Sequence, residues 1–563
     1  MPCDLLIKGG TVVDGTGADA YRADLAIAGG RIVRIGRIEE PADRTIDASG
    51  LIVAPGFVDP HTHFDAQIWW DSLVTSSSWH GVTTVVMGNC GVTLAPCRPA
   101  DRAALLHDLV NLEAIPYEAM TRGIEWKWES FPQYIAAGEQ RAFGINIAFV
   151  AALTPFRFYV MGEEACERAA TVEQTAQIKA LLKEAVAAGA FGWTTTTMRQ
   201  HVGHEGRPLA CRLAGEPELA AYCNALRELG KGSIEVALTK SPGILGDGEA
   251  RLLDVMLTES RRPITWLMLL DRDDDPEACQ RSLARAEALT RRGAIAQTNA
   301  LPVYNKFNLR NPFIFGGFDC CKAVVARPLD QQMRVYADAG FRRAFREESR
   351  KVKAFSFNWD LITVQEVVNP GLTRYAGMTI PELAAATRKD AADAFFDLAL
   401  EDGLETSFEI ALFNNDPKRV AKLVADQRTL IGLSDGGAHV DMHDNAGYCT
   451  YVLGTWARNR GALSLEEAVR RITSQPADFW GIRDRGRLAS GMAADLCIFD
   501  YNEIGLDSAA PVKRQQWRTD LPGGGRRLVW PADPGIKYVA VNGQILYDNH
   551  HHTGALPGRV LHS

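Results

Sequence analysis

The chain has 563 residues, 46% apolar and 23% charged, which is typical of a globular protein with several domains or with one large barrel and additions. Its 61 basic and 69 acidic residues give a net charge of −8, without the basic face that a nucleic-acid-binding protein needs. We find no membrane-spanning apolar run, no secretory signal and no paired spacing among the 11 cysteines, and so expect a cytoplasmic protein with free thiols.

The two ends of the chain share a β-rich pattern. Short runs rich in β-branched residues, separated by Gly and Asp turn signals, fill residues 5–56. The same pattern returns at 486–500 and at 537–548, where Asn542-Gly543 predicts a turn between two strands. We therefore expect residues 1–54 and 486–563 to meet and form one small β-sandwich domain.

The middle of the chain, residues 55–485, alternates between predicted strands and helices. Eight apolar, β-rich runs are expected to be strands: 51–59, 81–89, 145–153, 190–197, 233–240, 263–270, 294–303 and 429–437. Helical periodicity occurs at 171–189, 215–231 and 275–293, and each of these segments ends near a glycine. This alternation predicts an α/β fold with parallel βα units, and eight of them indicate a TIM-like (β/α)₈ barrel. The interval at about 304–428 is expected to be a helical and loop insertion that acts as a lid.

Two histidines lie one residue apart in DPHTHFD, where the first predicted strand ends. Residues i and i+2 of a strand face the same side, so His61 and His63 can present both imidazoles to one divalent metal. Cys90, at the end of the second strand, could add a thiolate ligand, although an inert buried thiol is the alternative. Asp435, in LSDGGAH after the last strand, could contact the metal and exchange a proton with water, or could simply cap a helix.

These segments together resemble the amidohydrolase superfamily, in its D-aminoacylase (N-acyl-D-amino-acid deacylase) branch. The resemblance covers nearly the whole chain and is carried by LLIKGGTVVDGTG, PGFVDPHTHFD, GVTTVVMGNCG, LSDGGAH and GRLASGMAADLCIFD. It implies a zinc-dependent amidohydrolase that cleaves the amide C–N bond of an N-acyl (D-)amino acid or related small amide by metal-activated water. It also implies that His61, His63, Cys90 and Asp435 bind one or two Zn²⁺ ions, and that Asp435 is the catalytic proton carrier.

The sequence departs from this family in the middle strands. Relatives usually supply histidines from the fifth and sixth barrel strands, whereas here no histidine occurs between His204 and His439. A single zinc ion is therefore favoured over two. Additional metal or substrate contacts are open to Lys240 if it is carbamylated, and to His201, His204, His439 and Arg199. A cation that binds a substrate carboxylate could come from Arg199, Lys240 or Arg310.

Two other functions stay open at this point. A hydantoinase-like hydrolase of cyclic amides or imides would share the ligands, and a carbamylated Lys240 would favour it. A metal-free structural or assembly protein is the alternative from another class, suggested by the missing histidines. The sequence predicts a small-molecule amide as the partner, with neither nucleic acid nor membrane. It leaves open the acyl group, the handedness of the substrate and whether the protein is a homo-oligomer.

Overall fold

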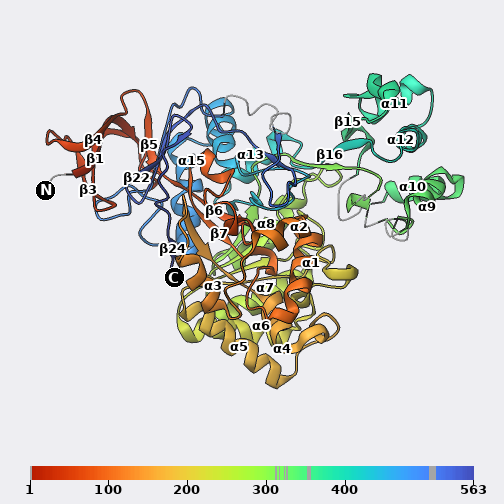
Figure 1. Ribbon diagram of the computed structural model, residues 1–563, viewed down its shortest axis with the longest axis horizontal. Helices are drawn as coiled ribbons and strands as arrows, with labels where there is room; N and C mark the ends of the chain where they lie inside the picture. Colours follow the sequence, from red (N-terminus) through yellow and green to blue (C-terminus); the bar gives the residue numbers. More distant parts are fainter. Residues whose placement is uncertain are drawn as a thin grey trace.

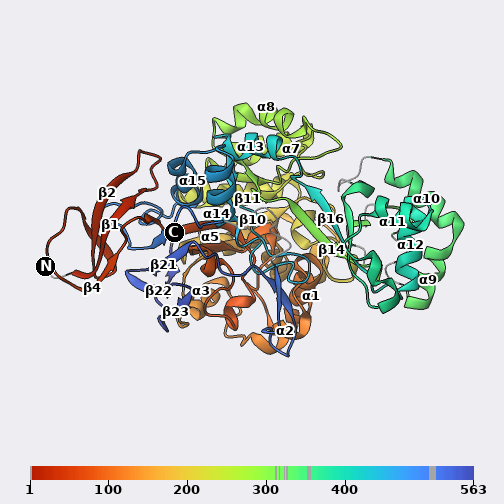
Figure 2. The ribbon, with the colours of Figure 1, turned by 90° about the horizontal axis from the view of Figure 1, so that it is seen from above.

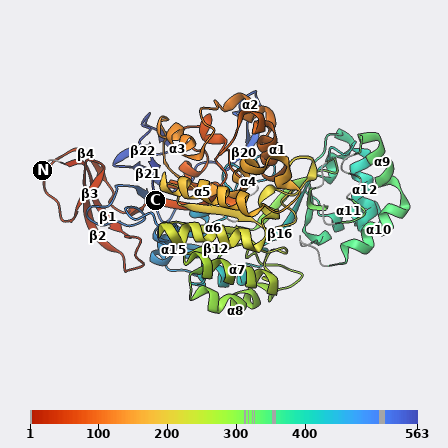
Figure 3. The same cartoon turned by 90° about the horizontal axis from the view of Figure 1, so that it is seen from below.

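The computed structural model describes residues 3–310, 313–315, 318–321, 324, 327–351, 357–505 and 515–563. A central α/β body lies between a β-sheet lobe that carries the N-terminus and a helical lobe at the opposite end (Figure 1). The same order along the long axis is visible from above in Figure 2 and from below in Figure 3. Among the described residues, no helix is long and apolar enough to cross a membrane.

Strands from both ends of the chain form one nine-stranded sheet. Its members are β1 (Cys3–Val12), β2 (Tyr21–Ala28), β3 (Arg31–Gly36), β4 (Ala42–Asp47), β5 (Ile52–Pro55), β18 (Leu496–Phe499), β21 (Ile536–Val541), β22 (Gln544–Asp548) and β23 (His551–His552). Strands β5 and β18 pair antiparallel and so join the two ends of the chain. Asn542 and Gly543 connect β21 to β22 with φ angles of 48° and 79°, which is the left-handed conformation that an Asn-Gly turn adopts. The predicted turn is therefore confirmed.

Strands occur at all eight positions predicted in the middle of the chain, but the run 51–59 is split: β5 joins the terminal sheet, and β6 begins at Phe57 and extends past the run to Thr62. The eight strands are β6 (Phe57–Thr62), β7 (Val82–Met87), β8 (Asn146–Phe149) with its continuation β9 (Ala151–Ala152), β10 (Gly192–Thr196), β11 (Ser233–Ala237), β12 (Ile264–Leu267), β13 (Ala294–Thr298) and β17 (Thr429–Ile431). Their pairings are parallel and run in sequence order, β6-β7-β8 and then β9-β10-β11-β12-β13-β17. The fold class is therefore α/β.

The two parallel ladders are linked at both of their edges. The third strand is interrupted only at Val150, whose N–H donates to the carbonyl of Met87 at 2.9 Å, so β8 and β9 carry the first ladder into the second. At the other edge, Thr62 and Gly436 form a parallel bridge, and the His63 N–H donates to the Gly436 carbonyl at 2.7 Å. The end of β6 is thus held against the segment that follows β17. Strand β24 (Val560–Leu561) pairs with β8 and not with the nine-stranded sheet.

The three predicted helices are confirmed as α5 (Val172–Ala187), α6 (Glu216–Leu229) and α8 (Ala278–Thr290). Thr171 and Gln174 form a reciprocal cap at the start of α5, and Gly230 ends α6 in the left-handed conformation that glycine favours. The remaining helices of the body are α1 (Arg102–Glu113), α2 (Tyr117–Gly123), α3 (Phe131–Glu139), α4 (Leu153–Met161), α7 (Asp247–Ser260), α13 (Pro417–Ala425), α14 (Tyr448–Tyr451), α15 (Leu465–Ile472) and α16 (Ser474–Trp480). Two short strands, β19 (Gln516–Arg518) and β20 (Arg527–Val529), form a separate hairpin-like pair.

The insertion between β13 and β17 has its own sheet and core. Strands β14 (Val303–Phe307), β16 (Ser407–Phe413) and β15 (Ile362–Glu366) pair antiparallel in that order. The helical lobe is formed by α9 (Leu329–Ala337), α10 (Ala339–Ser349), α11 (Ile380–Thr387) and α12 (Ala391–Glu401), and β14 and β16 connect it to the body (Figure 2). Phenylalanines such as Phe345 and Phe396, whose rings meet edge to face, fill its interior. Part of the aromatic loop at 305–321 lies outside the described residues.

Candidate metal centre

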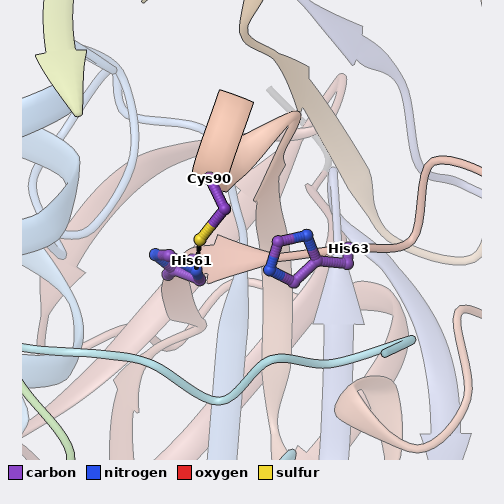
Figure 4. A group of neighbouring side chains, drawn as sticks. All are labelled: His61, His63 and Cys90. Carbon is purple, nitrogen blue, oxygen red and sulfur yellow. Dashed lines mark hydrogen bonds between the residues drawn. The ribbon is translucent and has the colours of Figure 1, made fainter. Parts of the chain in front are cut away.

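Three of the predicted metal ligands lie together at the carboxyl ends of β6 and β7. One donor atom from each of His61, His63 and Cys90 falls within 4.8 Å of the others, and all three side chains are buried. The Cys90 thiol points at the His61 ring, with Sγ at 3.6 Å from Nε2, and the His63 ring lies beside them (Figure 4). The i, i+2 spacing of the two histidines therefore places both rings at one point, as the sequence predicts.

Asp435, the fourth predicted ligand, faces the same point from the segment after β17. Its Oδ1 lies 3.3 Å from Nε2 of His61 and 3.8 Å from Nε2 of His63. Asp435 and Cys90 both have left-handed backbones, with φ of 50° and 54°. This conformation is strained for a non-glycine residue, so the surrounding structure must stabilise it. Such strained residues are concentrated at functional sites. At the neighbouring Gly436 a side chain would meet the Phe64 ring at 2.8 Å, so the turn can approach β6 only with glycine there.

A ring of polar groups lies behind these four side chains. The Glu113 carboxylate, at the end of α1, lies 3.4 Å from Nδ1 of His63, on the ring nitrogen that Asp435 does not face. Glu235 on β11 accepts the backbone N–H of Cys90 at 3.0 Å and so fixes the turn that carries the thiol. Burial lowers the pKa of His61, and the nearby side chain of Gln297, on β13, opposes that shift. Sequence reasoning missed Glu113 and Gln297 because no motif marks them.

Burial disfavours charge on every member of this cluster. It lowers the pKa of His61 to about 3, raises the pKa of Asp435 to about 7, and raises the pKa of the Cys90 thiol well above its usual range. Nδ1 of His61 and Nδ1 of His63 are buried without a hydrogen-bond partner. Neutral imidazoles beside a thiol and a carboxylate form the nitrogen, sulfur and oxygen donor set that zinc binds, and a bound cation would stabilise the anionic forms of Cys90 and Asp435. The residues present therefore fit a zinc ion.

The middle strands β11 and β12 carry no histidine where relatives were expected to supply one; β11 carries instead the buried Glu235, whose Oε1 has no hydrogen-bond partner among the described residues. After β11 and β12 the facing residues are Thr239 and Met268, and their groups bond to each other. The Met268 N–H donates to Oγ1 of Thr239 at 3.0 Å, and the Thr239 hydroxyl lies 3.2 Å from the Met268 carbonyl. A hydroxyl already engaged by backbone and a thioether do not replace two imidazoles as zinc ligands.

The other residues that the sequence nominated fall into two groups. His201 and His439 line the same cavity as the four ligands, together with His443. The other four residues do not line the cavity. The His204 ring stacks on the His107 ring, with centres 4.4 Å apart, and Arg199 and Lys240 are exposed. Arg310 forms an ion pair with Glu405 at 2.5 Å. The structure therefore does not place His204, Lys240 or Arg199 at the metal or substrate site. Nor does it place Arg310 where it could bind a substrate carboxylate. A position near a strand end does not determine where the side chain points.

A second cavity lies at the opposite ends of the same strands. It has a volume of about 590 Å³ and is bordered by Ser233 and Pro263 at the amino ends of β11 and β12. The cavity over the four ligands has a volume of about 140 Å³ and lies at the carboxyl ends. Catalytic residues of parallel α/β barrels lie at the carboxyl ends of the strands, which favours the smaller cavity as the active site.

Parallel strands that gather a His-x-His pair, a thiol and a carboxylate at their carboxyl ends are the arrangement of a metal-dependent barrel hydrolase. Comparison with known proteins gives the family. The amidohydrolase family model matches residues 44–316 and 319–547, so the chain belongs to this family, and the resemblance inferred from its motifs is confirmed.

Similar proteins of known name include two deacylases that match the full length of the chain. The chain is 29% identical to the D-aminoacylase of Alcaligenes xylosoxydans xylosoxydans, over 100% of this chain and 98% of that protein. It shares its fold, with a TM-score of 0.66 and 24% identity over 100% of both chains, with an N-acyl-D-glutamate deacylase from Bordetella bronchiseptica solved with zinc and a phosphonate inhibitor. The D-hydantoinase of Ralstonia pickettii is 43% identical, but over only 16% of this chain and 18% of its own.

Proposed function

We propose that the protein is a zinc-dependent hydrolase that cleaves the amide C–N bond of an N-acyl (D-)amino acid or a related small amide. The observation that carries this proposal is the convergence of His61, His63 and Cys90 within 4.8 Å of one another, with the Asp435 carboxylate against both imidazoles. Full-length similarity to D-aminoacylase supports amide hydrolysis, because the similarity includes the barrel, the insertion and the terminal sheet.

One zinc ion, held by His61, His63, Cys90 and Asp435, is proposed. A zinc ion bound there would polarise the scissile carbonyl and lower the pKa of water towards about 7. Side chains of the protein would transfer the proton and orient the ligands. Among the described residues, the carboxylate oxygen close to both Nε2 atoms is Oδ1 of Asp435, so Asp435 would accept the proton of the attacking water and return it to the leaving nitrogen. The Glu113 carboxylate, 3.4 Å from Nδ1 of His63, would orient that ring through an electrostatic contact.

The finer features of the architecture are proposals of the same kind. We infer that the eight strands close into a barrel, on the basis of the Thr62–Gly436 bridge between the first and last of them. Residues 1–54 with 486–563 would form the β-sandwich domain, 55–485 the catalytic barrel, and about 304–428 the lid. The insertion supports a lid because Val303 and Asn305 on β14 and Leu412 on β16 line the cavity. Eleven free cysteines are consistent with a cytoplasmic location.

The hydantoinase-like alternative has less support. Its similarity covers a small part of the chain. A carbamylated lysine would have to come from Lys240, whose side chain is exposed and does not line the cavity. A metal-free scaffold is disfavoured because three buried donors, His61, His63 and Cys90, lie together with the partly exposed Asp435.

A substrate screen tests the proposed function. Zinc-loaded protein would be incubated with N-acyl D- and L-amino acids, their carboxamides and a set of hydantoins, with and without a chelator, and the products identified by mass spectrometry. Chelator-sensitive release of a carboxylic acid from an N-acyl compound supports the proposal. Turnover of hydantoins alone would favour the cyclic-amide alternative, and no turnover with no bound zinc would favour the scaffold.

A further inference from the structure

The larger cavity, at the amino ends of the strands, has no part in the proposed hydrolysis. It has a volume of about 590 Å³ and is lined by residues at the start of β11 and β12, by the segment after α16 and by the chain around β24. Pockets that bind small molecules in proteins commonly have volumes of about 300–1,000 Å³. This cavity is therefore large enough for a small organic ligand.

Basic side chains outnumber acidic ones among the residues that line this cavity. Its two carboxylates are engaged by arginines that do not line it. Asp478 accepts two hydrogen bonds from Arg487, at 2.7 and 2.5 Å. Asp484 forms an ion pair with Arg31 at 3.3 Å. The basic side chains of the lining are Lys231, Arg262, Arg483, Arg485 and Arg559.

Two of these basic side chains have partners of their own. The buried Arg485 donates to the Asp495 carboxylate at 2.5 Å, and Nζ of Lys231 donates to the backbone oxygen of Ser563 at 3.2 Å. Arg483 and Arg559, in contrast, are exposed at the border of the cavity. Together with Arg262 they are the guanidinium groups best placed to meet a ligand.

Arg262 is held in place by backbone carbonyls. Its Nε donates to the Gly232 carbonyl at 2.8 Å and its Nη1 to the Gly230 carbonyl at 3.0 Å. Carbonyl oxygens orient a guanidinium but do not neutralise its charge. Partial burial lowers the pKa of Arg262, and the nearby charge of Arg483 lowers it further. Two guanidinium groups that repel each other at one cavity are stabilised when an anion binds beside them.

We propose that this cavity binds a small molecule with two or more phosphate groups, and that Arg262, Arg483 and Arg559 bind the phosphate oxygens. A guanidinium matches phosphate through paired, charge-assisted hydrogen bonds. The three arginines precede β12, follow α16 and precede β24, so one ligand can contact three separate segments. The inference is independent of amide hydrolysis, because the metal ligands lie at the opposite ends of the strands.

A series of matched ligands tests the inference. Isothermal titration of the zinc-loaded protein gives Kd for fructose 1,6-bisphosphate, fructose 6-phosphate, fructose and citrate. The bisphosphate is expected to bind at least about tenfold more tightly than the monophosphate, with no measurable binding of the uncharged sugar. No binding of the bisphosphate, equal binding of both phosphates, or tighter binding of citrate would overturn the ligand class.

Substitution of the two exposed arginines locates the binding site. Arg483→Gln/Arg559→Gln removes two charges from the border of the cavity and should raise Kd for fructose 1,6-bisphosphate at least about tenfold. Arg22→Gln/Arg388→Gln is the matched control, since both side chains are exposed and neither lines the cavity. The proposed metal ligands are intact in both variants, so any binding of phosphate at the zinc ion is the same in each. An unchanged Kd in the folded Arg483→Gln/Arg559→Gln protein would overturn the site.

Discussion

The Glu113 carboxylate lies 3.4 Å from Nδ1 of His63, on the opposite side of the ring from Asp435. Glu113 is the last residue of α1 and is buried. Its carbonyl accepts the His439 N–H at 2.5 Å, which ties the end of α1 to the segment after Asp435. A carboxylate behind a metal-binding imidazole fixes the orientation of the ring and raises its basicity.

Glu113→Gln is therefore expected to weaken zinc binding by about 10- to 100-fold, because the amide can hold the ring but does not raise its basicity. Competition with a chelator of known affinity measures the change. Glu118→Gln is the control, since that side chain is exposed and pairs only with Arg122. Unchanged zinc affinity in Glu113→Gln would show that Glu113 does not position His63.

Asp435→Asn is expected to reduce the rate per bound zinc by about 10²- to 10⁴-fold, because the amide cannot accept the proton. The rate is normalised to zinc because Asp435 is also a proposed ligand. Asp441→Asn, an exposed carboxylate in the same segment, is the control and should retain full activity. Near-native turnover by Asp435→Asn would remove Asp435 from the proton transfer.

Cys90→Ala should lower the zinc content of the purified protein, because it removes the only sulfur donor of the cluster. Elemental analysis against protein concentration measures this. Cys223→Ala removes an equally buried thiol from α6, away from the cluster, and should keep a full complement of zinc. If both variants retained one zinc per chain, Cys90 would be an inert core thiol.

Asp495 joins the terminal sheet to the central strands. It accepts hydrogen bonds from Arg485 at 2.5 Å, from the Asn146 amide at 2.8 Å and from the Asn542 N–H at 2.7 Å. Asp495→Ala removes the closest carboxylate of the buried Arg485, which keeps only a 3.6 Å contact with Asp484, so the free energy of unfolding should fall by about 3–5 kcal/mol. Asp548→Ala, at a half-exposed ion pair with Arg44, should cost no more than about 1 kcal/mol. Urea unfolding compares them, and equal midpoints would contradict a structural role for Asp495.

The strands were predictable because each is a short apolar run bounded by glycine, and the three predicted helices because their period and caps are local. Helix α7 was missed, although Glu249 at its start accepts the Gly246 N–H in a recognisable cap. The site was predictable only where one strand carries two ligands, as with His61 and His63, or where a family motif carries one. Glu113 lies 3.4 Å from His63 across 50 residues of sequence, and no local pattern encodes that contact.

The positions of Arg199, Lys240 and Arg310 could not be predicted from the sequence either. All three follow strands or lie in the insertion, and each could have pointed inward, but none is among the described residues that line the cavity over the metal ligands. Side-chain direction at strand ends depends on turns whose geometry the chain sets by distant contacts.

Activity measured against added zinc tests the proposed metal-dependent hydrolysis most directly. Zinc-free protein, prepared with a chelator, would be titrated with zinc while acetate release from N-acetyl-D-leucinamide and N-acetyl-D-leucine is followed together. We predict no turnover without zinc, a linear rise and a plateau at one zinc per chain, with His61→Ala/His63→Ala protein inactive throughout. Full turnover by the zinc-free protein, or none from either compound after zinc is added, would contradict the assignment.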